Sequence, residues 1–273
     1  MRADVLLVER GLAPSRTAAQ RLIAARLVFV GEGNSRVALS KPSVSVADDI
    51  SLEVEASDLD RFVSRGGLKL DGALTHVALD VAQLRCLDVG QSTGGFTDCL
   101  LQRGAAHVVG VDVGHDQLHP RMRADARVTC IEGVNARTLD ESVLVGAALA
   151  AIPRKQTTND GTVNRGQGRS NDVLFDLIVA DVSFISLTKV LPQWPALFAA
   201  TGRVLSLVKP QFEVGADNIN RGGIVRDVSL YAAVEKAIRG ACSQAGLRVL
   251  DYFDSSITGT DGNREFFIYA ERE

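Results

Sequence analysis

The hydrophobic positions follow two different patterns along the chain, and the change lies near residue 60. Ahead of it, a helical repeat places Ala19, Leu22 and Ile23 on one side of a helix that Ser15 is able to cap. A shorter helix is expected over 5–11, a strand over 27–30, and apolar alternation within 44–54 predicts further strands. We therefore predict a small α+β unit over residues 1–60.

Beyond residue 85, short apolar runs alternate with helical segments. Strands are predicted at 85–89, 107–112, 127–131, 173–181 and 203–208, helices at 96–103 and 229–245, and a final strand pair at 247–253 and 265–270. This alternation is typical of an α/β fold with a mostly parallel sheet. The predicted domain plan is the unit over 1–60, a linker over 61–68 and an α/β unit over 69–273.

One segment breaks the alternation. Residues 154–172 are rich in Asn, Gly, Gln, Thr, Arg and Ser, and Val163 is their single large apolar residue. Because so few apolar groups offset the entropy of ordering the chain, we predict a flexible insertion here.

Composition narrows the class of protein. The chain has 273 residues, of which 46% are hydrophobic, enough to bury a core and too many for a disordered protein. Its longest apolar stretch, 143–152, is too short for a bilayer span, which needs about 20 residues. The start lacks the features of a signal peptide, and four dispersed cysteines form no C-x-x-C pair. We expect a cytoplasmic protein with reduced cysteines and no bound metal.

Charge is distributed unevenly along the chain. The net charge of −3 gives no overall attraction to nucleic acid. Residues 1–47, however, carry seven Arg and Lys against three acids, and residues 48–60 carry six acids and no base. Such blocks indicate a patterned surface with a domain boundary near residue 60.

The first segment resembles a known RNA-binding module. R-x-D-x-L-L-V-E-R-G-L-x-x-S-R-x-x-A-Q-x-L-I, followed by V-x-V and K-P-S, is similar to the S4 domain. The resemblance implies that the second helix faces structured RNA. The implied RNA-binding residues are Arg2, Arg16, Gln20, Arg21, Lys41 and Arg65. The alternative is that these arginines merely form a solvated helix face.

A glycine-rich loop follows the strand at 85–89 and opens the next helix. It reads D-V-G-Q-S-T-G-G-F from Asp88 to Phe96, and Asp112 ends the following strand. Glycines let a ligand approach the backbone closely, and an acid such as Asp112 accepts hydrogen bonds from ribose hydroxyls. The loop is not G-x-G-x-x-G, and the carboxylate of Asp88 suits a sulfonium cation better than a diphosphate. We therefore predict S-adenosylmethionine rather than NAD as the ligand.

The second resemblance covers most of the remaining chain. The glycine loop, G-V-D-V-G, A-D-V-S-F-I-S and V-K-P-Q-F-E-V-G are similar to the TlyA family, whose catalytic domain is related to the FtsJ ribose methyltransferases. The resemblance implies a Rossmann-like class I methyltransferase fold, S-adenosylmethionine as cofactor, and 2′-O-methylation of cytidine in ribosomal RNA. Members are also often labelled haemolysins, which this composition does not support.

FtsJ-like enzymes use a Lys-Asp-Lys-Glu set, and the resemblance assigns it to Lys69, Asp181, Lys209 and Glu265. A ribose hydroxyl is a poor nucleophile, so an enzyme must align it with the methyl donor and help its proton to leave. We hypothesise that Lys209 is the base or orients the hydroxyl, that Lys69 lowers its proton affinity, and that the two acids position lysines and ribose. The predicted cofactor-binding set is Asp88, Gly90, Ser92, Thr93, Gly94, Gly95, Phe96, Asp112, Asn135 and Asp181.

Two other interpretations belong to different functional classes. In one, the chain is an RNA-binding ribosome-assembly factor with a silent methyltransferase fold, which the presence of all four set members argues against. In the other, it is a membrane-lytic protein, which the absence of a long apolar segment or a basic amphipathic helix argues against.

Overall fold

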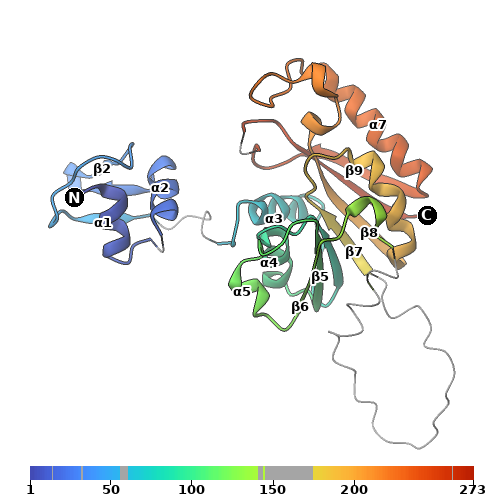
Figure 1. The fold of residues 1–273 in the computed structure, drawn as a ribbon, viewed down its shortest axis with the longest axis horizontal. Coiled ribbons are helices and arrows are strands. Elements are labelled where there is room, and N and C mark those ends of the chain that lie inside the picture. The colour runs from blue at the N-terminus through green and yellow to red at the C-terminus, as the bar shows by residue number, and fades with distance from the viewer. Residues whose placement is uncertain (14, 32, 56–60, 141–143, 145–174, 260) are drawn as a thin grey trace, which may run out of the picture. The chain divides into compact units, whose positions relative to one another are not determined.

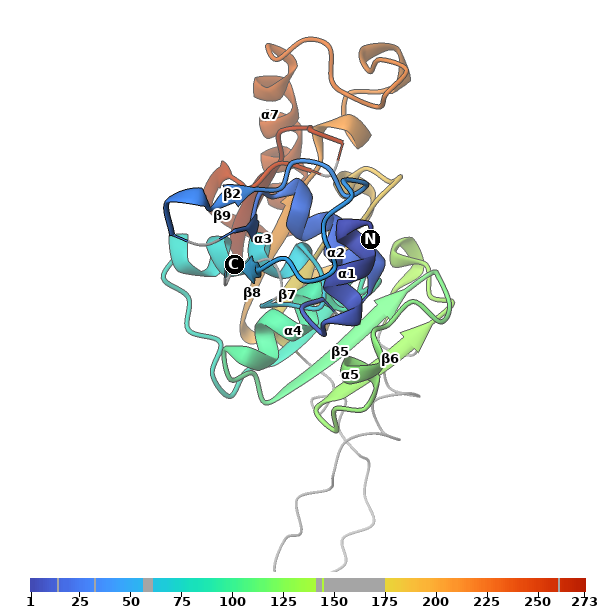
Figure 2. The ribbon, with the colours of Figure 1, turned by 90° about the vertical axis from the view of Figure 1, so that its left-hand side faces the viewer.

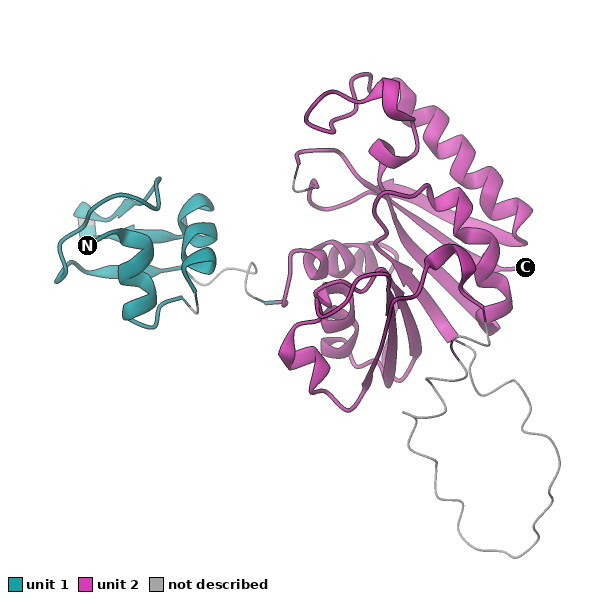
Figure 3. Ribbon diagram, in the orientation of Figure 1, with its two compact units in different colours: residues 1–61 teal, residues 62–273 magenta. Residues whose placement is uncertain are grey.

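The computed structural model describes residues 1–13, 15–31, 33–55, 61–140, 144, 175–259 and 261–273. They form two compact units, residues 1–61 and 62–273 (Figure 3). The insertion predicted at 154–172 lies outside the described residues.

The smaller unit packs two helices on a three-stranded antiparallel sheet. Helices α1 (Ala3–Glu9) and α2 (Arg16–Ala24) lie side by side, as Figure 2 shows. Strands β1 (Val28–Val30), β2 (Val37–Ala38) and β3 (Leu52–Val54) pair in the order β2-β1-β3. Ser15 caps α2 by accepting a hydrogen bond from the backbone N–H of Ala18 at 3.2 Å, and the helical repeat buries Ala19, Leu22 and Ile23 as predicted.

The larger unit is built on a seven-stranded sheet. Its strands are β4 (Arg85–Val89), β5 (His107–Asp112), β6 (Val128–Glu132), β7 (Phe175–Ala180), β8 (Phe198–Val208), β9 (Leu247–Asp254) and β10 (Phe266–Arg272). They lie in the order β6-β5-β4-β7-β8-β10-β9, and β10 runs antiparallel to both of its neighbours. The other pairings are parallel, which confirms the predicted α/β class with a mostly parallel sheet.

Helices cover both faces of this sheet (Figure 1). One face packs against α3 (Gly66–His76), α4 (Gly95–Gln102) and α5 (Pro120–Arg123), and the other against α7 (Leu230–Gln244) and the short helices η5 (Leu187–Lys189) and η6 (Leu191–Leu197). Along β7, Leu177 and Val179 enter the first core, and Ile178 and Ala180 enter the second. Burial on both faces explains why central strands such as β7 are nearly continuous apolar runs.

The segment predicted as a linker over 61–68 is instead part of the larger unit from residue 62 onward. Phe62 is 4% exposed in the core beneath α3 and α4, and α3 begins at Gly66. Glycine has low helix propensity, so the pair Gly66-Gly67 hides the helix start in the sequence. The glycine at 67 is required by packing, because a Cβ there would lie 2.3 Å from the ring of Phe62.

Strand order reverses at β4. From β4 the chain passes through β5 to β6 on one side, and it continues through β7 and β8 on the other. Loops after the strands diverge at such a point and leave a crevice beyond the carboxyl ends, which is where ligands bind in open α/β sheets. The loops after β4, β7 and β8 are therefore the place to look for a site.

Candidate active site

The loop between β4 and α4 depends on its glycines. Gly90 and Gly94 have φ of +84° and +90°, a region that favours glycine. A Cβ on Gly90 would also lie 2.7 Å from the carbonyl oxygen of Asp181, so the loop touches the end of β7 directly. Ser92 adopts φ +46° and is exposed at the tip together with Thr93. The glycines thus let the loop curl tightly over the edge of the sheet.

Asp88 lies beneath this loop. Its side chain is buried, and Oδ2 accepts a hydrogen bond of 2.6 Å from the hydroxyl of Thr97, which also receives one of 2.9 Å from Gln91. Oδ1 is buried and has no hydrogen-bond partner in the structure. Burial raises the pKa of Asp88 to about 7, against the opposing effect of Thr97.

Asp112 ends β5 next to the same loop. Its Oδ2 accepts the backbone N–H of Ser92 at 2.8 Å, and its Oδ1 accepts that of Gly114 at 2.7 Å. A carboxylate oxygen has a second lone pair, so both oxygens can still accept a ligand hydroxyl. Asp112 therefore fixes the loop tip and remains available to a ribose.

Two members of the predicted cofactor set have structural partners of their own. Phe96 is 3% exposed and stacks on Phe267 within the core, because it lies in the first turn of α4 on the side that faces the sheet. Asn135 is exposed, and its side chain accepts the backbone N–H of Arg137 at 3.0 Å, capping the short helix η3 (Ala136–Thr138). Gly95 is packed tightly, since a Cβ there would lie 2.1 Å from Ser64 Oγ.

The four residues of the predicted Lys-Asp-Lys-Glu set form two ion pairs. Lys209 Nζ lies 2.6 Å from Asp181 Oδ1 and donates to Ser183 Oγ at 2.8 Å. Lys69 Nζ lies 2.6 Å from Glu265 Oε2. The Lys209–Asp181 side chains are 12% and 23% exposed, and the Lys69–Glu265 side chains 10% and 3%. In the Lys209–Asp181 pair, the carboxylate of Asp181 is therefore accessible to a substrate, whereas the Lys69–Glu265 pair is almost fully buried.

Sheet register brings these pairs to one edge. Asp181 follows β7 and Lys209 follows β8, at the carboxyl ends of parallel neighbours. Phe266 of β10 pairs with Val208, so Glu265 and Lys209 are the next positions at the same end of the ladder. Lys69 comes from α3, whose first residue, Gly66, would bring a Cβ within 3.7 Å of Asp181 Oδ2. Residues far apart in the chain therefore meet at the end of the sheet where Gly90 touches Asp181.

Sequence reasoning missed an exposed aromatic residue in the loop after β7, next in the chain to the Ser183 that Lys209 contacts. Phe184 is 91% exposed, has φ +62°, and lies with its ring 5.2 Å from that of Phe212, at a tilt of 49°. Large apolar side chains are seldom displayed in strained backbone without a function. The available signal was a phenylalanine within the segment S-F-I-S, three residues after the end of a predicted strand.

Glu213 ties the two loops of this edge together. Its carboxylate accepts Ser186 Oγ at 2.6 Å and the backbone N–H of Leu187 at 2.7 Å, and burial raises its pKa. It follows Lys209 within the same segment, which includes η7 (Pro210–Phe212). The loop after β7 is therefore held to the loop after β8 at both of its ends.

Comparisons with known proteins match this architecture. The model of the FtsJ-like methyltransferases matches residues 62–272, and that of the S4 domain matches residues 1–32. A Mycobacterium tuberculosis protein named 16S/23S rRNA (cytidine-2′-O)-methyltransferase TlyA is 40% identical over 272 residues, which span 100% of this chain and 90% of that protein. The chain belongs to the TlyA family of FtsJ-like methyltransferases.

Other relatives in this family have different names. Hemolysin A of Brachyspira hyodysenteriae is 34% identical, with coverage of 98% of this chain and 99% of that protein. A solved structure titled as a putative hemolysin from Streptococcus thermophilus has a TM-score of 0.69 and 35% identity, and covers 100% of this chain and 88% of that one. In the described part of this chain, no helix has the length and apolarity that a membrane crossing needs.

Within the S4-like unit, three of the predicted RNA-binding residues converge on one buried acid. Arg2 contacts Asp4 through Nε and Nη2 at 2.9 and 3.0 Å, and Gln20 Nε2 and Arg16 Nη2 reach Asp4 Oδ2 at 2.9 and 3.3 Å. The Arg2 and Arg16 side chains are nevertheless 45% and 58% exposed. Arg21, Lys41 and Arg65 are exposed, the last of them directly before α3 in the larger unit. Arg2, Arg16, Gln20, Arg21 and Lys41 are all exposed on the S4-like unit, and we refer to them together as its basic face.

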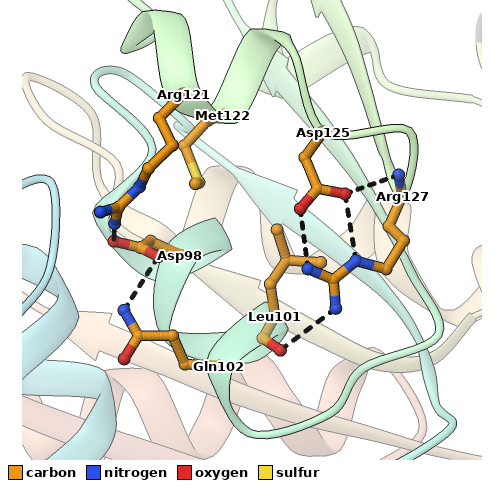
Figure 4. A pocket seen from close by; sticks show the side chains of 7 residues that line it. All are labelled: Asp98, Leu101, Gln102, Arg121, Met122, Asp125 and Arg127. Carbon is orange, nitrogen blue, oxygen red and sulfur yellow. Dashed lines mark hydrogen bonds and ion pairs between the residues drawn. The ribbon is translucent and has the colours of Figure 1, made fainter.

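The larger unit also has a hollow that none of the four ion-paired site residues lines. It is lined by Asp98, Leu101, Gln102, Arg121, Met122, Asp125 and Arg127, from α4, α5 and the turn after α5 (Figure 4). Its arginines are already paired, Arg121 with Asp98 at 2.5 Å and Arg127 with Asp125 at 2.7 Å. Because none of the four ion-paired site residues lines it, we assign the hollow no part in the chemistry.

Proposed function

We propose that this protein transfers a methyl group from S-adenosylmethionine to the ribose 2′-hydroxyl of a cytidine in ribosomal RNA. The observation that carries the proposal is the meeting of two lysine–carboxylate pairs at the edge where the glycine loop emerges, in a chain 40% identical to a named rRNA (cytidine-2′-O)-methyltransferase. Membership of the family indicates the class of reaction, and the four side chains indicate where in the structure it would take place.

The residues around the loop suit the cofactor. Gly90 lets the loop pass directly against the backbone of Asp181, and the buried Oδ1 of Asp88 has no hydrogen-bond partner among the described residues. Asp112 offers carboxylate lone pairs to ribose hydroxyls. Ser92, Thr93, Gly94 and Asn135 complete the proposed contacts through exposed groups or backbone. When bound, S-adenosylmethionine supplies a methyl group on a positively charged sulfur.

Lys209 is the residue we assign to the ribose hydroxyl. It is anchored by Asp181 and Ser183, so its remaining donor points along a fixed direction. Holding the hydroxyl in line with the methyl group removes much of the entropy barrier of the reaction. With S-adenosylmethionine bound, the oxygen–carbon bond would form as the carbon–sulfur bond breaks to leave a neutral thioether, and the hydroxyl proton would leave towards the Lys209–Asp181 pair. The partly exposed Asp181 gives that proton a route to solvent.

Lys69 and Glu265 are proposed to support Lys209 through the positive charge of Lys69. Their nearly buried pair places a fixed positive charge at the edge next to Lys209. A preorganised charge of this kind stabilises negative charge that develops on the attacking oxygen. Glu265 keeps the lysine in place, so that its charge needs no rearrangement during the reaction.

Phe184 is suited to the base of the target nucleotide. Enzymes that act on a nucleotide within structured RNA must take it out of its stack, and a flipped base commonly rests on an aromatic ring. Phe184 follows Ser183, the hydrogen-bond partner of Lys209, and its exposed ring lies against that of Phe212. We therefore propose that it stacks on the target cytosine while the ribose lies at the lysines.

The S4-like unit is proposed to dock on ribosomal RNA through the basic face that bears Arg2, Arg16, Gln20, Arg21 and Lys41. Exposed arginines bind phosphates, and this contribution to affinity falls with salt. Arg65, in the larger unit, is proposed as a further RNA contact. A ribosomal RNA substrate implies that the protein works in the cytoplasm.

The direct test is transfer of a labelled methyl group from S-adenosylmethionine to purified ribosomal subunits, with Lys209→Met as the inactive control. We expect incorporation into RNA by the wild-type chain, confined to 2′-O-methylcytidine after digestion. Mapping the modified position with and without the protein identifies the subunit and nucleotide.

Two outcomes of that assay would favour the other classes. Tight binding to subunits with no incorporation would indicate an assembly factor whose methyltransferase fold is silent. Absence of both binding and incorporation, with leakage of liposomes instead, would favour the activity implied by the haemolysin names.

A further inference from the structure

Asp4 is the acid that Arg2, Arg16 and Gln20 of the S4-like unit contact, and its side chain is completely buried. Its side chain has no exposed surface, whereas the arginines that contact it are about half exposed. Its backbone N–H is bonded to the carbonyl of Pro42 at 3.2 Å, and that of Ala3 to the carbonyl of Val44 at 2.9 Å. The position of Asp4 is therefore fixed by its place at the start of α1 and by backbone hydrogen bonds to the segment that bears Lys41.

Three side chains take their direction from this fixed point. Arg2 binds it with two parallel N–H groups, the geometry in which a guanidinium plane is held most firmly. Arg16 and Gln20, one turn apart on α2, bind the same Oδ2. Two arginines that would otherwise repel each other are held on one face, because a negative charge lies between them.

The arrangement leaves most donors free for another ligand. A guanidinium has five N–H donors; Asp4 takes two from Arg2 and one from Arg16. The other arginines of this unit with assigned partners are used differently: Arg10 donates to the carbonyls of Asp48 and Ile50, and Arg36 pairs with Glu53 and Glu55. Free donors next to a buried anchor are the geometry that phosphate oxygens require.

We propose that Asp4 is a positioning residue for RNA binding: it orients Arg2, Arg16 and Gln20 so that their free donors meet consecutive phosphates of the ribosomal RNA. This proposal rests on the proposed function, since it takes ribosomal RNA as the ligand. It replaces the simpler view that each basic side chain acts by its charge alone.

The two views predict opposite signs for the same substitution. If charge alone mattered, Asp4→Asn would remove a negative charge, raise the net charge of the unit by one and strengthen its binding to RNA. If Asp4 orients the arginines, the substitution weakens binding, because the asparagine amide presents N–H donors where Arg16 and Gln20 also donate. Holding flexible side chains ready for a ligand raises affinity, so releasing them lowers it.

The matched control is Glu9→Gln. Glu9 is an exposed acid on the same helix, so this variant makes the same change in charge without touching the Asp4 cluster. Both full-length variants are compared with the wild-type chain for binding to purified ribosomal subunits over a range of salt concentrations. We expect Asp4→Asn to bind about tenfold more weakly, and its affinity to depend less steeply on salt, by an amount equal to the loss of about two phosphate contacts. Glu9→Gln should bind as well as the wild type or slightly better. Equal or tighter binding by Asp4→Asn overturns the proposal.

A second set of variants covers the case in which Asp4→Asn unfolds the small unit, which far-ultraviolet circular dichroism and thermal unfolding would reveal. The Arg2→Lys, Arg16→Lys double variant keeps both charges but loses the planar fork that Asp4 grips. We expect it to bind more weakly and, where the small unit stays folded, to show little additional loss when combined with Asp4→Asn, because coupled residues are not additive. Weakened binding with fully additive losses, or unchanged binding by the lysine variant, contradicts the proposal. If the wild-type chain shows no salt-dependent binding to subunits, it is the proposed function that fails.

Discussion

Asp4 in the smaller unit and Asp88 in the larger unit are both buried aspartates, and their surroundings make them opposites. Asp4 is enclosed by two arginines and a glutamine, and the bidentate Arg2 holds its pKa well below the usual range. Asp88 receives a hydroxyl from Thr97 and no cation, and burial raises its pKa to about 7. Burial alone does not set the state of a carboxyl group; its partners do.

The cations of the two units differ in the same way. The arginines around Asp4 are about half exposed, whereas Lys69 and Lys209 are 10% and 12% exposed. Exposed guanidinium groups suit phosphates that arrive from solvent, and enclosed lysines suit a single hydroxyl that must be held and deprotonated. The comparison assigns docking to one unit and chemistry to the other.

The largest expected effect is on the lysine that we place at the hydroxyl. Lys209→Met should reduce methyl transfer by about a thousandfold, because both the alignment and the route for the proton are lost, while S-adenosylmethionine still binds. Single-turnover rates and cofactor titration measure the two separately. Near-normal turnover in this variant would remove Lys209 from the mechanism.

The next largest effect is on the free energy of unfolding, and it differs between the two ion pairs. Glu265→Gln leaves the nearly buried Lys69 without its partner and should lower the free energy of unfolding by about 3 kcal/mol. Asp181→Asn affects a pair that is open to water and should cost about 1 kcal/mol. Urea unfolding of the two variants gives the comparison, and equal losses would mean that the difference in exposure has no energetic consequence.

Removing the smaller unit tests the division between docking and chemistry. Deletion of residues 1–60 should weaken binding to ribosomal subunits by about a hundredfold, because its phosphate contacts are lost. Affinity for S-adenosylmethionine should remain close to that of the full chain, since the glycine loop lies in the larger unit with its own core. Parallel losses of both affinities would show that the units are not independent.

The smallest effect is on how stability depends on pH, and it has opposite signs for Asp88 and Asp4. The folded protein holds the proton of Asp88 up to about pH 7 while the unfolded chain releases it near pH 3.9, so stability falls as pH rises between these values. Asp4 contributes stability that is present above the unfolded value and lost as pH falls through its lower folded pKa.

Thermal unfolding from about pH 5 to about pH 8 separates these contributions. The stability of wild type relative to Asp88→Asn should decline over this range, and that relative to Asp4→Asn should stay constant. A decline for Asp4→Asn, or a constant difference for Asp88→Asn, would contradict the assignment of partners.

Local patterns predicted most elements, and the failures have identifiable causes. Ser15 followed by an apolar repeat gave α2, and continuous apolar runs gave the parallel strands, because capping and burial act within a few residues. Helix α3 was missed because its start, Gly66-Gly67, is dictated by close packing against Phe62 rather than by helix propensity. The cofactor contact predicted for Phe96 stays a prediction, and the structure shows in addition that its ring stacks on that of Phe267 in the sheet.

The sequence by itself determined the two-unit plan, the α/β class, the glycine loop and the candidate residues, since each is written in neighbouring positions. Tertiary structure decided which charges meet: that Lys209 pairs with Asp181 and Lys69 with Glu265, and that Asp4 gathers Arg2, Arg16 and Gln20. The physical reason is that ion pairing depends on distances of a few ångströms between residues that sheet register and helix packing bring together from distant parts of the chain.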